Sequence, residues 1–297
     1  MVSVLLIAAV ILLYTMQNLF CRIYTGYYPG EKRNASPVYT VVSGLSVALV
    51  TLCFAGFSFS AKPLTLLLAL LNAAALVGYN AFIIKASQTG SYSILMVFAI
   101  AGGIAIPAVV ARFAFGDPLS VLKVISLLGI FVSVYMVSYK KEEKTEEKKK
   151  TRALFLIVCT ALGICNGAYG ALLDVQQRLT GESEKEEMVI ITFLLGAIVS
   201  AIMLFAAEKK NTLKAFVQNK KSTVFLILCA VVSALAINVM VYILKLVDVT
   251  VLYTFDNSGV MVLSVLASWL LFKEKLLPIN IIGCVTMCAA LVGVAIF

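Results

Sequence analysis

The sequence contains no histidine, and only 13% of its 297 residues are charged. An average soluble domain is about one quarter charged and about half apolar, whereas this chain is 62% hydrophobic. The scarcity of charge excludes an ordinary soluble domain and indicates an integral membrane protein. Without histidine, without a metal-ligand cluster and without a nucleophile motif, we do not expect an enzyme.

The seven cysteines are scattered through apolar segments, and no two of them form a CxxC pair. This distribution does not predict a disulfide framework, and the missing histidine also argues against a zinc site. Cys284 and Cys288 lie one helical turn apart, and we interpret them as small packing residues. We therefore expect neither a metal nor another cofactor.

Long apolar runs fill most of the chain, and little sequence remains for a domain outside the membrane. A helix needs about 20 mostly apolar residues to cross a bilayer. Because no basic segment precedes the first run, we expect it to be a span rather than a cleaved signal peptide. Ten runs meet the length requirement: 2–20, 37–57, 63–84, 92–115, 119–139, 153–173, 188–207, 223–244, 249–272 and 276–297.

The charged segment KKEEKTEEKKKTR, residues 140–152, divides the chain into two halves, 1–139 and 153–297. Its mixed signs and lack of apolar residues predict a solvated linker, so the net charge of +9 does not indicate a nucleic-acid partner. Each half has five predicted spans, and an odd number places the second half upside down in the membrane. The sequence thus predicts an all-α membrane protein of ten transmembrane helices, arranged as two inverted five-helix repeats.

The two halves also match each other in sequence at an offset of 157 residues. The loops agree with inversion, because the loop after the first span is basic and its counterpart after the sixth is acidic. The like pairs are Leu95 and Leu252, Phe98 and Phe255, Gly102 and Gly259, Phe115 and Phe272, Asp117 and Glu274, and Leu119 and Leu276.

Two stretches, FAFGDPLSVLKVISLLGIFVSVYMVS and WLLFKEKLLPINIIGCVTMCAALVGVAIF, resemble the paired signature of the EamA-type family of the drug/metabolite transporter superfamily. In that family each fourth helix ends in an apolar stretch, an acidic residue and a leucine, and the fifth resumes with a glycine. Glu274 and Gly283 follow this pattern, while the first half has Asp117 and Ser126 at the two positions. The resemblance implies a ten-helix inverted-repeat secondary transporter without implying a particular substrate.

Most of the 24 lysine and arginine residues lie in loops that follow odd-numbered spans. Positively charged loops stay preferentially in the cytoplasm. We therefore expect loops 22–36, 140–152 and 208–222 to be cytoplasmic and both termini to lie outside, in the plasma or inner membrane. Gly163 and Gly167 form a small-xxx-small pair, which predicts close packing between helices.

Four predicted spans carry an amide and a phenol on one face. Inverted-repeat transporters bind their substrates near the bilayer midplane between the halves, where such polar groups are expected. The alternative is that these side chains form hydrogen bonds between packed helices. The pairs are Tyr14 with Asn18, Asn72 with Tyr79, Asn166 with Tyr169, and Asn238 with Tyr242.

Asp256 is the acidic residue that lies well inside an apolar span, next to Asn257 and on one face with Tyr253. Burying a carboxylate there costs at least about 2.5 kcal/mol, so a functional role is the first hypothesis. Three roles are open: the carboxyl group carries a proton during transport, it binds a cationic substrate, or it is a structural group. Its counterpart in the first half is the apolar Ala99.

Together these features predict a carrier that moves a small organic metabolite or cation by alternating access, with proton coupling as an option. Its expected partners are the lipid bilayer and a small-molecule substrate, and we expect a monomer or a homodimer. The alternatives are a membrane protein without transport activity, such as a scaffold or receptor, and a small-solute channel.

Overall fold

The computed structural model of the protein describes residues 2–118, 120–139, 146–180, 184–207, 219–243, 246 and 249–296. These residues form helices joined by turns, and none of them lies in a strand. A short 3-10 helix, η1 (Lys32–Asn34), precedes α2. The long helices are α1 (Val2–Tyr27), α2 (Ala35–Phe54), α3 (Pro63–Thr89), α4 (Tyr92–Phe115), α5 (Val121–Ser138), α6 (Glu146–Thr180), α7 (Lys185–Ala207), α9 (Lys220–Ile243), α10 (Val249–Leu270) and α11 (Pro278–Ile296).

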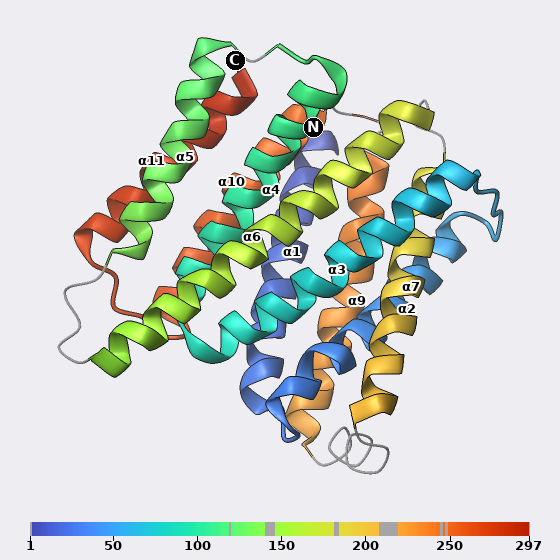
Figure 1. The fold of residues 1–297 in the computed structure, drawn as a ribbon, viewed down its shortest axis with the longest axis horizontal. Coiled ribbons are helices and arrows are strands. Elements are labelled where there is room, and N and C mark those ends of the chain that lie inside the picture. Colours follow the sequence, from blue (N-terminus) through green and yellow to red (C-terminus); the bar gives the residue numbers. More distant parts are fainter. Residues whose placement is uncertain are drawn as a thin grey trace.

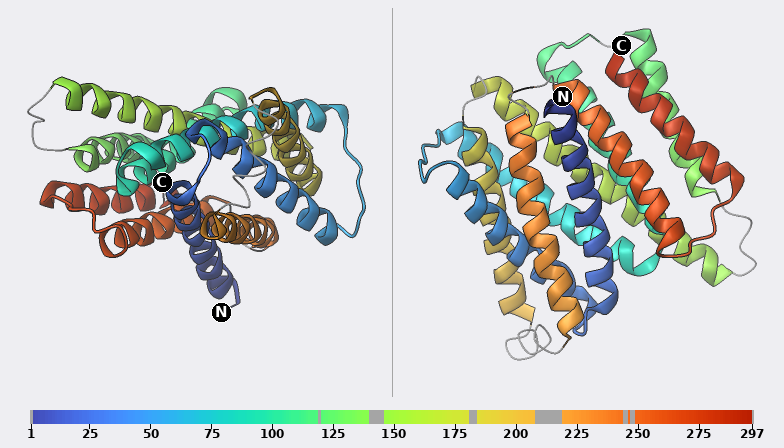
Figure 2. Two further views of the ribbon diagram at one scale, coloured as in Figure 1. Left: turned by 90° about the horizontal axis from the view of Figure 1, so that it is seen from below. Right: turned by 180° about the vertical axis from the view of Figure 1, so that it is seen from behind.

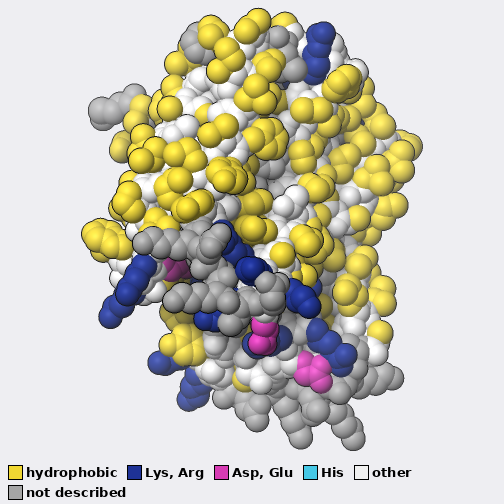
Figure 3. Space-filling model, turned by 60° about the vertical axis from the view of Figure 1, so that its left-hand side comes forward, with side chains coloured by type: hydrophobic (Ala, Val, Ile, Leu, Met, Phe, Trp, Pro, Cys, Tyr) yellow, Lys and Arg dark blue, Asp and Glu magenta, His cyan; other side chains and the backbone are white. Residues whose placement is uncertain are grey.

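Within the described part of the chain, eight helices are long and apolar enough to cross a membrane: α1 to α7 and α9. Helices α10 and α11 contain shorter apolar stretches, Phe255–Leu270 and Pro278–Val294. Figure 3 shows one face of the molecule, on which apolar side chains cover the body and basic side chains gather toward the lower end. The prediction of an integral membrane protein with many helical spans is therefore confirmed.

Several helices extend beyond the apolar runs that predicted them. Helix α1 continues to Tyr27, and α6 begins at Glu146, inside the segment predicted to be a solvated linker. Hydropathy marks only the part of a helix that contacts lipid, whereas glutamate and lysine favour helix and prolong it into the polar region. Residues 140–145 of the linker lie outside the described residues.

Local signals in the sequence explain where individual helices begin and end. The Ser120 hydroxyl accepts a hydrogen bond from the Lys123 N–H at 3.1 Å and caps the start of α5. Gly116 ends α4 in the left-handed region, with φ of 74°, and its N–H donates to the Arg112 carbonyl at 3.1 Å. Pro63 opens α3, where a missing N–H costs nothing.

The chain ends and the turns define two sides of the molecule. Both termini lie at one end, together with the turns that follow α2 and α4; we call this end the termini side (Figures 1 and 2). The turns that follow α1, α3 and α10 lie at the opposite end, the far side. Helices α5 and α11 pack against each other at one edge and contact the rest of the bundle through α4 and α10.

Close packing of α4 on α6 depends on glycine. A Cβ atom added to Gly102 would lie 2.0 Å from the Gly163 carbonyl oxygen, and one added to Gly167 would lie 2.3 Å from the Gly102 carbonyl oxygen. No side chain larger than hydrogen fits at these distances without moving a backbone. The small-xxx-small pair Gly163 and Gly167 therefore packs two helices closely, as predicted.

Candidate functional site

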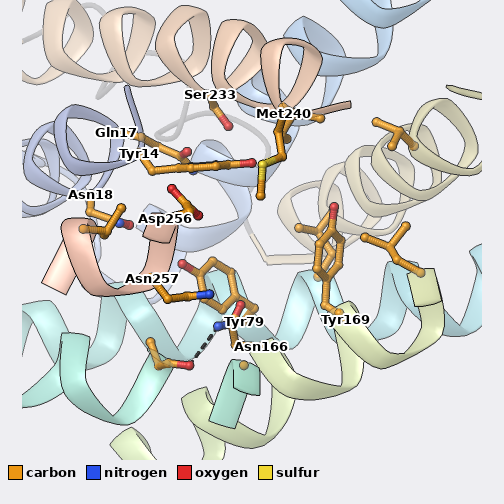
Figure 4. A pocket seen from close by; sticks show the side chains of 18 of the residues that line it. Tyr14, Gln17, Asn18, Tyr79, Asn166, Tyr169, Ser233, Met240, Asp256 and Asn257 are labelled. Carbon is orange, nitrogen blue, oxygen red and sulfur yellow. Dashed lines mark hydrogen bonds between the residues drawn. The ribbon is translucent and has the colours of Figure 1, made fainter. Parts of the chain in front are cut away.

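A cavity of about 230 Å³ lies among the helices, and α5 and α11 do not contribute to it. Figure 4 shows its lining from close by. Its walls mix apolar side chains, such as Leu76, Ile100 and Val260, with tyrosines, amides and a carboxylate. An apolar cavity with a few convergent polar groups is the usual form of a small-molecule site.

Asp256 of α10 is the carboxylate in this lining, and its side chain is buried. Its Oδ1 atom has no hydrogen-bond partner within the described protein. The Oε1 atom of Gln17, from α1, is also buried without a partner, and Figure 4 places Gln17 in the same region of the cavity as Asp256. Both atoms accept hydrogen bonds, and buried acceptors of this kind favour a donor supplied by a ligand or by water.

Six of the other predicted site residues line this cavity beside Asp256. Asn166 donates from Nδ2 to the Ala99 carbonyl oxygen at 2.8 Å, the hydrogen bond drawn in Figure 4. The Tyr169 ring packs edge-on against Phe193 with 6.5 Å between centroids. The six are Tyr14, Asn18, Tyr79, Asn166, Tyr169 and Asn257.

Three predicted site residues do not line the cavity. Asn72 is fully buried elsewhere in the bundle, and neither polar atom of its amide has a described partner. Asn238 donates to the Thr51 hydroxyl of α2 at 3.0 Å, and Tyr242 is exposed on the outer surface. Helix α9 instead turns Ser233, Ile237, Met240 and Val241 toward the cavity, a face rotated by roughly one residue from the predicted one. The side chain of Tyr253 lies outside the described residues.

The cavity also contains polar residues that the sequence did not single out. Gln17 stands next to the predicted Asn18, and Lys185 lies in a stretch that the sequence marked only as an acidic loop. Tyr39 and Ser43 of α2 also line the cavity. The sequence did not indicate them as site residues, because their span does not carry an amide and a phenol on one face. The remaining polar members of this group are Asn80, Gln177 and Ser233.

No group of three or more cysteine, aspartate or glutamate side chains among the described residues is placed to hold a metal ion. The polar groups of the cavity lining are one carboxylate, amides, phenols, two serine hydroxyls and Lys185. Such groups can form hydrogen bonds and charge interactions.

The fold and its cavity define a polytopic membrane protein with a cavity of about 230 Å³ between its helices. Residues 149–296 match the EamA-like transporter family, so the chain belongs to that family and is a membrane transporter, which confirms the resemblance seen in its motifs. No curated protein matches the sequence significantly. One solved structure, described only as the crystal structure of a protein, is similar over 99% of this chain and 97% of its own, with a TM-score of 0.62 and 16% identity. This likeness shows a shared fold.

Proposed function

We propose that the protein is a secondary transporter that moves a small organic solute through the central cavity by alternating access. The observation that carries the proposal is the buried, unpartnered carboxylate oxygen of Asp256 in a cavity shared by both halves of the chain. Intramembrane carboxylates are costly, and they mark substrate or proton pathways. A scaffold or receptor has no need of such a group.

Two inverted repeats with ten spans are part of this proposal, and the positions and contacts of the helices support them. The starts of α3 and α9, at Pro63 and Lys220, are 157 residues apart, the offset at which the two halves match in sequence. The starts of α4 and α10, and of α5 and α11, differ by the same amount. The helix contacts are also equivalent when the two halves are exchanged. Helix α1 packs on α9 as α6 packs on α3, and α10 packs on α1 as α4 packs on α6. Inverted repeats of this kind bind substrate at their interface.

The chemistry of the lining favours a solute that carries a protonated amine. Such a group donates N–H hydrogen bonds to Asp256 Oδ1 and Gln17 Oε1 and supplies the charge that a buried carboxylate needs. The neighbouring Tyr14 ring offers an apolar face and cation–π attraction. When the solute leaves, a proton binds to Asp256 and neutralises the carboxylate in place of the cationic solute. The return of the empty carrier is thereby coupled to protons.

Countertransport in proteoliposomes tests the proposal. Vesicles with purified protein are preloaded with one member of a panel of small amines and neutral metabolites, and uptake of the same compound in radiolabelled form is measured. Saturable uptake that depends on the internal load supports a carrier, and Asp256→Asn should abolish it for amines. Uptake that never saturates would indicate a channel, and no uptake with any compound would contradict transport.

A further inference from the structure

Arg22 of α1 joins three segments at the far side. Its Nη1 donates to the carbonyl oxygens of Ser87 and Gly90, at the end of α3, at 2.7 and 2.9 Å. Its Nη2 lies 3.8 Å from Glu274 Oε1 in the turn after α10, and its guanidinium lies 5.3 Å from the centre of the Phe272 ring. A guanidinium with this many partners holds α1, α3 and the end of α10 together.

Glu274 extends the same cluster to α4. Its Oε1 accepts the Tyr92 N–H at 2.7 Å, and its Oε2 accepts the hydroxyls of Ser91 and Ser268. Burial alone would raise the pKa of Glu274, but the hydrogen bonds from Ser268, Ser91 and Tyr92, together with the charge of Arg22, outweigh burial and hold the pKa below its ordinary value. The carboxylate is therefore ionised at neutral pH and caps the first turn of α4.

A second cluster with an arginine, a carboxylate and a phenylalanine ring lies at the termini side. Arg178 of α6 donates from Nη1 to Asp117 Oδ1 at 2.9 Å, and its guanidinium lies 4.9 Å from the centre of the Phe115 ring. Phe115 and Asp117 precede Phe272 and Glu274 by 157 residues, so the ring and the carboxylate occupy equivalent positions in the two halves. Each arginine comes from the first helix of the opposite half.

The two clusters differ in exposure. The side chains of Arg22 and Glu274 are 17% and 15% exposed, whereas those of Arg178 and Asp117 are 36% and 40% exposed. The cavity lining reaches Gln177, which adjoins Arg178, but on α1 it ends at Asn18, one turn before Arg22. The cavity lining thus runs farther toward the exposed cluster along α6 than toward the buried cluster along α1, and none of the four charged residues lines it.

We propose that Arg22 and Glu274 form the closed gate of the far side, and that Arg178 and Asp117 form the equivalent gate, which becomes buried when the termini side closes. The inference rests on the proposed transport function, because only a carrier needs to close its two sides in turn. Neutralising one gate shifts the population toward the state in which that side is open.

Cys21 is a natural reporter for the far-side gate. It lies one turn beyond Gln17 on the same face of α1, and its side chain is 2% exposed. Labelling by N-ethylmaleimide needs contact with water, so the labelling rate of Cys21, quantified by peptide mass spectrometry, measures opening of the far side. Cys53, which is exposed, serves as the internal reference in the same sample.

Glu274→Gln removes the ion pair with Arg22 and the charge that strengthens the hydrogen bonds to Glu274. The loss of these interactions should raise the rate of Cys21 labelling about ten-fold or more. Glu31→Gln is the matched control, because Glu31 lies at the same side in an exposed pair with Arg33. Ser91→Ala, which removes one donor to Glu274, should give a smaller increase and serves if Glu274→Gln does not fold.

Asp117→Asn distinguishes a gate from a local structural contact. It weakens the state in which the termini side is closed, so the double variant Glu274→Gln/Asp117→Asn should label Cys21 more slowly than Glu274→Gln alone. Wild-type labelling in both Glu274→Gln and Ser91→Ala, or equal labelling of the single and double variants, would overturn the proposal. Because labelling needs no solute, failure of the gate is separable from failure of countertransport.

Discussion

Asn166 Nδ2 donates a hydrogen bond to the carbonyl oxygen of Ala99 at 2.8 Å and thereby joins α6 to α4. Ala99 occupies the position in the first half that Asp256 occupies in the second, 157 residues later. A Cβ atom at Gly103 would lie 2.6 Å from Asn166 Nδ2, so the glycine makes room for the amide. Of the two positions that match at the 157-residue offset, one is thus a packing contact and the other a buried carboxyl group.

Asn166→Ala should lower the melting temperature of the purified protein. Hydrogen bonds between membrane helices contribute on average about 0.6 kcal/mol, and here the Ala99 carbonyl loses the donor that it has besides its own helix. Thr160→Ala is the control on the same helix, because Thr160 is exposed and bonds only within α6, to the Leu156 carbonyl. A thermal-shift measurement in detergent compares the two variants, and equal melting temperatures would show that the Asn166 bond contributes nothing.

Asp256→Asn should raise the melting temperature of the solute-free protein while it removes amine transport. An amide is less costly to bury than a carboxylate without a partner, by about 1 kcal/mol or more, which corresponds to roughly 2–4 °C. Asp174→Asn provides the contrast, because it removes an ion pair with Arg178 at 3.0 Å near the surface and should not raise the melting temperature. If Asp256 were a paired structural group, the Asp256→Asn variant would melt at a lower temperature than the wild type.

Gly102→Ala should destabilise the contact between α4 and α6. The added methyl group would meet backbone atoms of Gly163, and overpacking of a well-packed interior costs about 1–3 kcal/mol. Gly26→Ala is the matched control, because a Cβ atom there would have no other atom within 4 Å. The yield of monodisperse protein and its melting temperature should fall for Gly102→Ala alone, and a similar effect of both changes would contradict the packing argument.

Hydropathy predicted the helices well, because a span that contacts lipid must be apolar and this apolarity can be read from the residues of that span alone. The faces that meet the cavity were harder to predict, as α1 and α9 show. Tyr14 and Asn18 of α1 line the cavity, whereas the rotation of α9 depends on its packing against α2, where Asn238 donates a hydrogen bond to Thr51. The partners of Arg22 could not be predicted, since they come from the end of α3 and the turn after α10, far away in the chain.

The stability of the protein should fall in acid partly through Glu184. Hydrogen bonds from the Thr65 hydroxyl and the Lys62 N–H hold the pKa of Glu184 below its ordinary value of 4.5. A carboxyl group whose pKa is lower in the folded state stabilises the fold above its unfolded pKa and loses this contribution as pH falls through the folded value. Melting temperatures of wild type and Glu184→Gln should therefore differ at pH 7 and converge below about pH 4. A difference that stays constant with pH would contradict this account.

The orientation in the membrane follows from where lysine and arginine gather. The far side carries the turns after α1, α3 and α10 and the start of α6, with Lys148, Lys149 and Lys150. Basic loops remain in the cytoplasm, so the termini side should face outward. An epitope tag after residue 297 should bind antibody on intact spheroplasts, whereas a tag inserted within residues 208–218 should bind only after permeabilisation. The reverse pattern would invert the orientation, and the gate of Arg22 and Glu274 would then close the outer side of the membrane.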